Sequence, residues 1–89
     1  MPRFQIGEIL VTPGATFFLD LENISLTTLI ARHANGDWGE LPGEDAQANE
    51  AALKHGGRLF SRYVYYGEPV YVITDADRSL TTILLPNEY

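Results

Sequence analysis

The chain has 89 residues, of which 45% are apolar, and a net charge of −6 from twelve acidic and six basic side chains. This length suffices for one small domain, and the apolar fraction excludes a compositionally disordered chain. Because there is no cysteine, disulfides, thiolate metal sites and thiol nucleophiles are excluded. The acidic balance disfavours nucleic acid as a partner. Neither a signal-like start nor a long apolar run is present, so we expect a cytoplasmic protein without membrane contact.

The N-terminal part predicts a short strand followed by a helix. Residues 4–12 alternate partly and are rich in branched side chains, which is typical of a strand. Thr12 can cap the helix that follows, and Pro13 suits its first position. We expect this helix to end near Asn23.

Two further helices are predicted over residues 25–36 and 41–57. Ser25 caps the first and Gly36 ends it. The second has acidic side chains in its first turn and basic ones in its last, which matches the helix dipole at both ends. The apolar face of the first is formed by Leu26, Leu29, Ile30 and His33.

The C-terminal part predicts three strands, over residues 58–66, 69–75 and 79–86, joined by links short enough for antiparallel hairpins. We therefore expect residues 1–89 to form a single small α+β domain. In this fold an N-terminal short strand and about three short helices pack on a C-terminal three-stranded antiparallel meander, and the N-terminal strand lies on an edge.

The stretch RHANGDWGELPGED, residues 32–45, joins the second and third predicted helices and holds the only tryptophan. We interpret Gly36 and Gly39 as parts of a tight joint. Trp38 is expected to fill the space between the helices and the sheet, whereas an exposed Trp38 would be an interface anchor. These three residues are the structural candidates of the chain.

A catalytic hypothesis depends on the two histidines, which lie near helix C-termini, where the dipole favours the protonated form. With Arg58 or Arg78 as the cation for a phosphate, His33 could serve a small metal-independent ribonuclease or toxin-like enzyme. That site requires the three groups to converge in space. The competing interpretation is structural: His33 closes the apolar face of its helix, and His55 is an exposed last-turn residue.

A calcium loop is suggested by Asp75, Asp77 and Ser79, which occupy the first, third and fifth positions of such a motif. The pattern then fails, because Leu80 stands where the loop needs glycine and Pro86 where it needs glutamate. The two histidines have no zinc spacing. We therefore expect no metal site and no cofactor.

Two sets of side chains are candidates for contact with another protein. The run from Asp37 to Glu50 holds five acids and no base, and it is either a solvated helix start or a docking face for a basic partner. Tyrosines lie on two adjacent predicted strands, and tyrosine is enriched at interface hot spots. The candidate residues are Arg32, His33, Asp37, Glu40, Glu44, Asp45, Tyr63, Tyr65 and Tyr71.

Four segments, TPGA, ARHANGDWGEL, ANEAALKHGGRLFSRY and VITDADRSLTTILLPNEY, cover nearly the whole chain. Together they resemble a family of short bacterial proteins on plasmids and integrative elements. Its members carry names such as plasmid-related protein or, misleadingly, type I restriction modification subunit; 89 residues leave no room for a methyltransferase domain. Tyr71 departs from the family, which often has tryptophan there. The resemblance implies that Arg32, His33, Gly36 to Gly39, Ala76 to Ser79 and Leu84 to Tyr89 are family features.

The leading hypothesis is a small, acidic, non-enzymatic protein of a mobile element that binds another protein, in its most concrete form an anti-defence inhibitor of a nuclease or restriction complex. The genomic setting that the resemblance implies and the acidic charge support it. The ribonuclease-like enzyme is the first alternative. A structural homodimer, in which an exposed sheet face is buried on a second copy, is the second.

Overall fold

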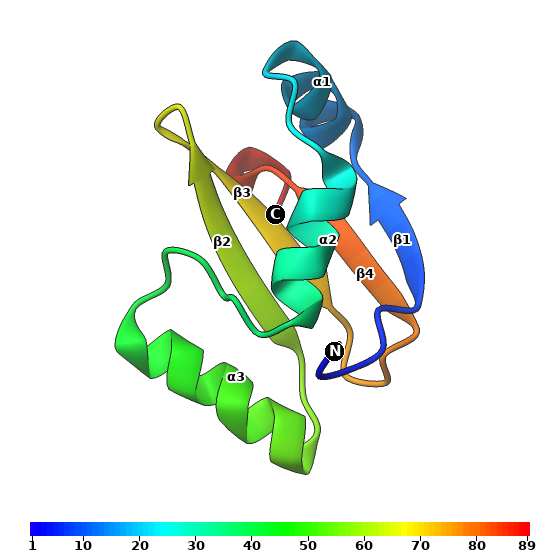
Figure 1. Ribbon diagram of the computed structural model, residues 1–89, viewed down its shortest axis with the longest axis vertical. Coiled ribbons are helices and arrows are strands. Elements are labelled where there is room, and N and C mark those ends of the chain that lie inside the picture. The colour runs from blue at the N-terminus through cyan, green and yellow to red at the C-terminus, as the bar shows by residue number, and fades with distance from the viewer.

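A computed structural model describes residues 1–89 as a four-stranded sheet with three α-helices (Figure 1). The sheet order is β1-β4-β3-β2, antiparallel except for the parallel pair of β1 and β4. The predicted α+β class with an N-terminal edge strand is confirmed. The elements are β1 (Glu8–Val11), α1 (Pro13–Leu21), α2 (Leu26–Ala34), α3 (Gly43–His55), β2 (Leu59–Tyr65), β3 (Glu68–Thr74), β4 (Leu80–Leu84) and the 3-10 turn η1 (Pro86–Glu88).

The first two helices begin where their capping residues predict. The Thr12 hydroxyl accepts from the Ala15 N–H at 3.2 Å, and the Ser25 hydroxyl accepts from the Thr28 N–H at 3.3 Å. Each bond satisfies one of the amides that a helix start leaves free. α3 begins at Gly43, later than predicted, and no side chain caps it.

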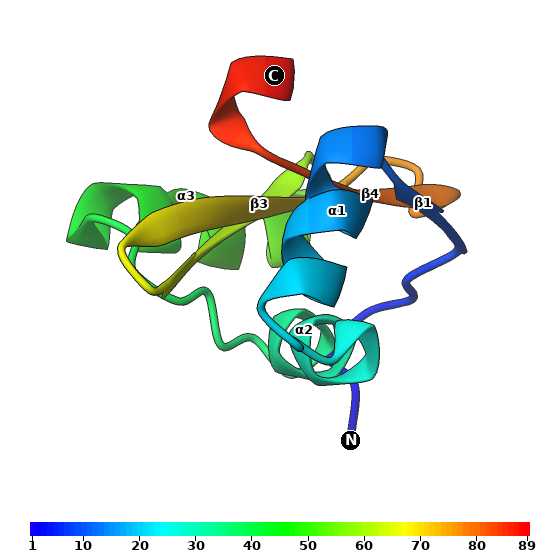
Figure 2. The same ribbon diagram turned by 90° about the horizontal axis from the view of Figure 1, so that it is seen from above.

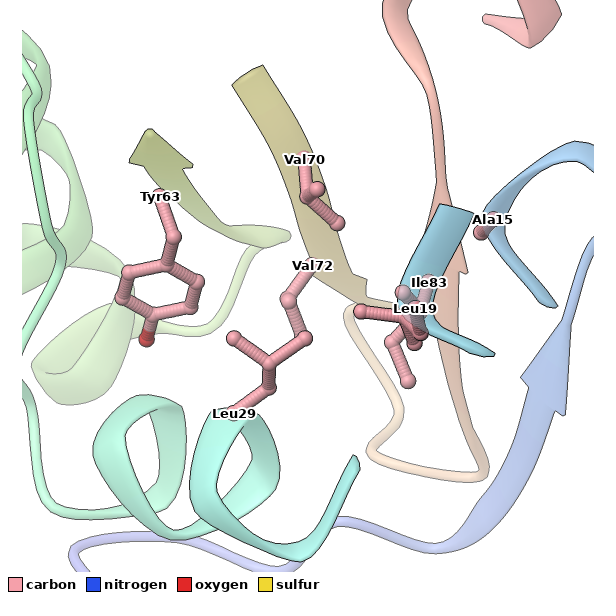
Figure 3. Packing of buried hydrophobic residues seen from close by; sticks show 7 residues of the cluster. All are labelled: Ala15, Leu19, Leu29, Tyr63, Val70, Val72 and Ile83. Atoms are coloured by element: carbon pink, nitrogen blue, oxygen red, sulfur yellow. The ribbon is translucent and has the colours of Figure 1, made fainter. Parts of the chain in front are cut away.

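One face of the sheet is covered by α2, and the main core lies between them (Figures 2 and 3). Alternation along the strands sends every second side chain into this layer. A smaller cluster of Trp38, Ala52 and Leu59 joins α3 to the start of β2. The main core consists of Ala15, Leu19, Leu29, Tyr63, Val70, Val72 and Ile83.

The opposite face of the sheet carries the C-terminal segment (Figure 2). The Tyr89 ring lies edge-on to the rings of Phe60 and Tyr71, with centroids 6.2 and 5.9 Å away. The predicted last strand is too long, because β4 ends at Leu84 and η1 follows. The turn is held by Glu88, whose carboxylate accepts from the Thr12 hydroxyl at 2.6 Å. No helix is both long and apolar enough to cross a bilayer.

Candidate functional site

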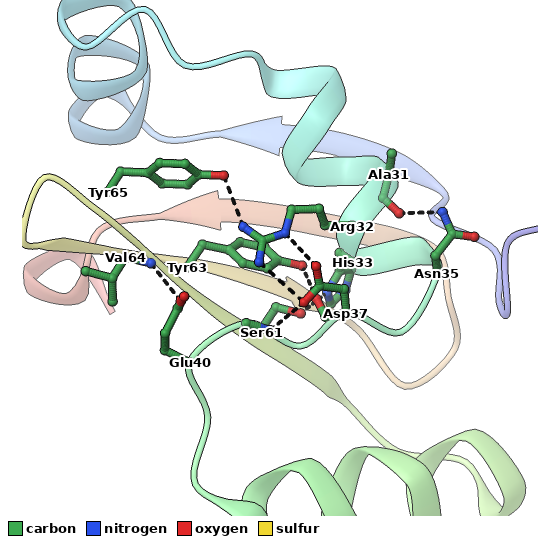
Figure 4. Close-up of polar contacts among 11 residues, drawn as sticks. Ala31, Arg32, His33, Asn35, Asp37, Glu40, Ser61, Tyr63, Val64 and Tyr65 are labelled. Atoms are coloured by element: carbon green, nitrogen blue, oxygen red, sulfur yellow. Dashed lines mark hydrogen bonds and ion pairs between the residues drawn. The ribbon is translucent and has the colours of Figure 1, made fainter.

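The largest polar cluster of the predicted site joins the end of α2 to β2 (Figure 4). Arg32 Nε lies 2.7 Å from the Asp37 carboxylate, and an Arg32 terminal nitrogen donates to the Tyr65 hydroxyl at 3.2 Å. The guanidinium carbon lies 4.3 Å from the centre of the Tyr63 ring, whose hydroxyl donates to the Asp37 carbonyl at 2.6 Å. This geometry combines an ion pair with a cation–π contact. It locks the joint after α2 onto the sheet.

The charges in this cluster stabilise each other. The hydrogen bond from Arg32 lowers the pKa of the Asp37 carboxyl, and the same bond raises the pKa of the Arg32 guanidinium. Burial raises the pKa of the Tyr63 hydroxyl. All three groups therefore keep one protonation state around neutral pH, which is typical of a structural cluster rather than of acid–base chemistry.

His33 lies at the centre of a buried chain of hydrogen bonds. Its Nδ1 is 2.5 Å from the Ser61 hydroxyl and its Nε2 is 2.9 Å from the Thr74 hydroxyl, which is 2.7 Å from the Thr81 hydroxyl. Thr81 must donate to the Ile6 carbonyl, at 2.7 Å, because a carbonyl only accepts. Thr81 therefore accepts from Thr74, and Thr74 from the protonated Nε2 of His33. In the neutral ring, Nδ1 then accepts from the Ser61 hydroxyl.

The surroundings of His33 favour the same neutral form. The side chain has no exposed surface, and its ring lies 5.1 Å from the Phe4 ring and 5.8 Å from the Trp38 ring, centre to centre. Burial, with a smaller contribution from the charge of Arg78, lowers the pKa of His33 to about 4. Both nitrogens are engaged, so a substrate would have to displace Ser61 or Thr74 to reach the ring.

The two arginines of the catalytic hypothesis have other partners. Arg78 donates to the carbonyls of Gly57 at 2.6 Å and Ala52 at 3.2 Å, which ties the β3–β4 turn to the end of α3. Arg58 donates to the Tyr89 hydroxyl at 2.6 Å on the face of the sheet that η1 covers. No hydrogen bond joins either arginine to His33.

Most of the acidic run is engaged within the chain. Glu50 forms an ion pair with Arg3 at 2.7 Å and accepts from the Trp38 indole at 3.1 Å; these two bonds lower its pKa to about 2. The Glu40 carboxylate accepts from the Val64 amide at 2.9 Å. With Asp37 paired to Arg32, this leaves Glu44 and Asp45, both exposed in the first turn of α3.

The joint between α2 and α3 packs closely against the sheet. Trp38 is 7% exposed and lies beside Ala52 and Leu59. Gly39 has a φ of +74°, and a Cβ there would overlap the Arg62 carbonyl oxygen. Gly36, with a φ of +81°, leaves α2 in the left-handed region that favours glycine.

The three candidate tyrosines differ in accessibility. Tyr63 has no exposed surface and belongs to the main core, so it is unavailable to a partner. Tyr65 is half-buried under Arg32, and Tyr71 is half-buried on the opposite face of the sheet, with its ring centre 4.7 Å from that of Phe60. The tyrosines therefore do not form one surface.

Most of the exposed apolar side chains lie on β1, α1 and the start of α2. The side chains of Ile9 and Leu10 on β1, Phe17 and Leu21 on α1, and Leu26 at the start of α2 are 44%, 54%, 68%, 66% and 36% exposed. The sequence-based expectations did not include these side chains as candidates. One signal was available: residues 17–21 of the short α1 are almost all apolar, more than one face of a helix can bury.

Comparison of the chain with known proteins gave no match. No protein-family model, curated protein or solved structure matches the chain. No three His, Cys, Asp or Glu side chains are grouped so that they could hold a metal ion.

Proposed function

We propose that this chain is a non-enzymatic protein-binding domain, and that its binding surface consists of the exposed apolar side chains of β1, α1 and the start of α2. The observation that carries the proposal is a contrast between two groups of side chains. The polar cluster around Arg32 and His33 is engaged within the chain, and no buried polar side-chain atom lacks a partner. Five of the eight exposed large apolar side chains, in contrast, belong to these three elements.

The resemblance to short proteins of plasmids and integrative elements supplies the setting of the proposal. In that setting the partner is another cytoplasmic bacterial protein, and inhibition of a nuclease or restriction complex is the most concrete form of the activity. The surface assigned to the interaction is β1 and α1 rather than the acidic run, because Asp37, Glu40 and Glu50 are engaged within the chain.

The proposal is tested by capturing partners from a bacterial host with the immobilised chain and identifying them by mass spectrometry. One enriched protein is expected, which binds the purified chain at fixed stoichiometry in calorimetry. The double variant Phe17→Ser with Leu21→Ser should lose this binding. Tyr66→Ser is the matched control, because Tyr66 is 75% exposed but lies on the β2–β3 turn. Equal loss in both variants contradicts the proposed surface.

A second assay tests the proposal from the opposite side. The purified chain is incubated with labelled RNA, and we expect no cleavage above that of a mock preparation. Cleavage by the wild type that disappears in His33→Gln, a variant that offers one acceptor and one donor group as the neutral ring does, would establish the enzymatic alternative and overturn the proposal.

A further inference from the structure

The outer edge of β1 has unpaired backbone groups. The amides of Glu8 and Thr12 donate to the carbonyls of Ser79 and Ile83 on the β4 side, each at 3.0 Å. Alternate residues of a strand direct their backbone groups to opposite sides, so Ile9 and Val11 direct N–H and C=O away from β4. Figure 1 shows that no other element lies along this side of β1. The edge therefore offers two donors and two acceptors to an incoming strand.

An apolar groove lies beside this edge, between β1 and α2. Ile9 and Val11 face α2, because they are in register with the buried Thr81 and Ile83. Along α2 the surface is hollowed twice. A hollow of about 200 Å³ is lined by Val11, Leu19, Ile24 and Leu26 among others, and one of about 680 Å³ by residues 2–6 and the side of α2 that includes Ile30 and Ala34.

The segments that form this edge and line the groove beside it carry more acidic than basic side chains. From Phe4 to Ala31 the sequence holds three acids, Glu8, Asp20 and Glu22, and no Lys or Arg. Arg3, the one cation that lines the groove, is paired with Glu50. A partner with lysine or arginine is therefore attracted to this edge, whereas a second copy would bring three further acids to it.

We propose that the β1 edge binds an extended segment of a partner protein as a fifth strand, with apolar side chains alternating toward the groove and Lys or Arg on the other side. This inference rests on the proposed function and names the partner's chemistry. Main-chain bonds to Ile9 and Val11 hold the segment, and the groove selects its alternate side chains. Glu8 lies on the face away from α2, because it is in register with Leu80, so a basic side chain of the added strand forms a cross-strand pair there.

The probe for the test is a synthetic heptapeptide of alternating lysine and valine, followed by amide hydrogen exchange. In the free chain we expect the amides of Ile9 and Val11 to exchange quickly and that of Leu10 slowly. The peptide should protect Ile9 and Val11, because only strand addition pairs alternate residues. A peptide with glutamate in place of lysine is the charge control. Equal binding of the two peptides overturns the proposal, as does binding that leaves both amides unprotected.

The matched variants are Ile9→Pro and Ile9→Thr. Proline removes the outward N–H, which no bond within the chain uses, and its ring blocks the edge, so we expect the fold to be kept. Both variants replace the isoleucine side chain, so the difference between them reports on the edge. We expect Ile9→Pro to weaken peptide binding about tenfold or more and Ile9→Thr to change it about twofold at most. Equal affinities for the two variants overturn the proposal.

Two remaining outcomes separate this inference from the proposed function. If the amides of Ile9 and Val11 are already protected in a concentration-dependent manner, with a dimer mass in light scattering, a second copy occupies the edge and the inference is wrong. If a captured partner binds Ile9→Pro as tightly as wild type but not the Phe17 and Leu21 double variant, the inference fails and the proposed function stands. If every variant binds the captured partner as tightly as the wild type, the proposed function itself is wrong.

Discussion

The two edge strands of the sheet, β2 and β1, differ in whether their outward backbone groups have hydrogen-bond partners. At β2 most of the outward backbone groups are bonded within the chain: Asn49 bonds both the N–H and the C=O of Phe60, at 3.0 and 2.7 Å. Residues 38–40 bond the N–H and C=O of Arg62, at 3.1 and 2.6 Å. The Val64 amide donates to a carboxylate of the same joint at 2.9 Å. β1, in contrast, has no partner on its outer side.

Contacts from other parts of the chain therefore cover the β2 edge but not the β1 edge. β2 is closed by a joint and a helix, through contacts between residues 11 and 24 positions apart in the sequence, and this closure protects it from pairing with other chains. Nothing comparable covers β1, although its Ile9 and Leu10 are exposed. An uncovered apolar edge promotes aggregation unless it has a partner, so the difference favours binding at β1.

The largest expected effect comes from opening the closed edge at Gly39. In Gly39→Ala the added Cβ overlaps the Arg62 carbonyl oxygen, and the alanine would also have to keep the positive φ of this position. The joint therefore has to move away from β2. We expect a loss of about 4 kcal/mol in the free energy of unfolding, measured by urea denaturation. Gly43→Ala is the control, because no atom lies within 4 Å of its Cβ. If the two variants are equally stable, the joint does not hold the edge.

The second effect concerns the buried chain that connects the two edges, from Ser61 on β2 through His33 to the Ile6 carbonyl before β1. The pKa of His33 is about 4 in the folded chain, against an ordinary value of 6.5. Between these values the unfolded chain binds more protons, so stability is complete above about pH 6.5 and is lost as the pH falls through 4. The loss approaches about 3 kcal/mol.

Urea denaturation between pH 7.5 and 4 measures this loss, and His33→Gln should remove this part of the slope. The titration of the His33 ring, followed by NMR, is an independent check. A ring that becomes protonated near pH 6.5 would show that the buried chain does not exclude the charged form.

Local signals were sufficient to predict most of the fold. The caps at Thr12 and Ser25 act within one helical turn, and the short hairpin links set the order of β2, β3 and β4. The end of β4 was predicted wrongly, because it depends on a contact between Glu88 and Thr12, which are 76 residues apart. No pattern of local periodicity contains such a contact.

The candidate site was harder to predict for the same reason. Alternation along β2 places Ser61 and Tyr63 on one face, but it does not say which helix residue meets them. His33 binds Ser61 and Thr74 on two strands, 28 and 41 residues away. Sequence spacing therefore favoured a half-buried histidine at the end of an apolar face, with catalysis as the alternative, whereas in the folded chain the side chain is fully buried.

The third effect is expected from removing one side chain that closes the β2 edge. Asn49→Ala leaves the N–H and C=O of Phe60 without their partners, so we expect a loss of about 2 kcal/mol in the free energy of unfolding. Gln47→Ala, at an exposed position of α3, should change stability by less than about 0.5 kcal/mol. Faster exchange of the Phe60 amide alone would locate the damage at this edge.

The smallest effect is expected at the open edge. Leu10→Thr and Ile9→Thr should each change the free energy of unfolding by about 0.5 kcal/mol at most, because both side chains are exposed and threonine suits a strand. Urea denaturation of both variants beside Asn49→Ala compares the edges in one experiment. If the threonine variants lose as much stability as Asn49→Ala, β1 is covered in solution. If the free energy of unfolding hardly changes, the stability of the chain does not require the exposed apolar side chains at β1. Binding to a partner then accounts for their presence.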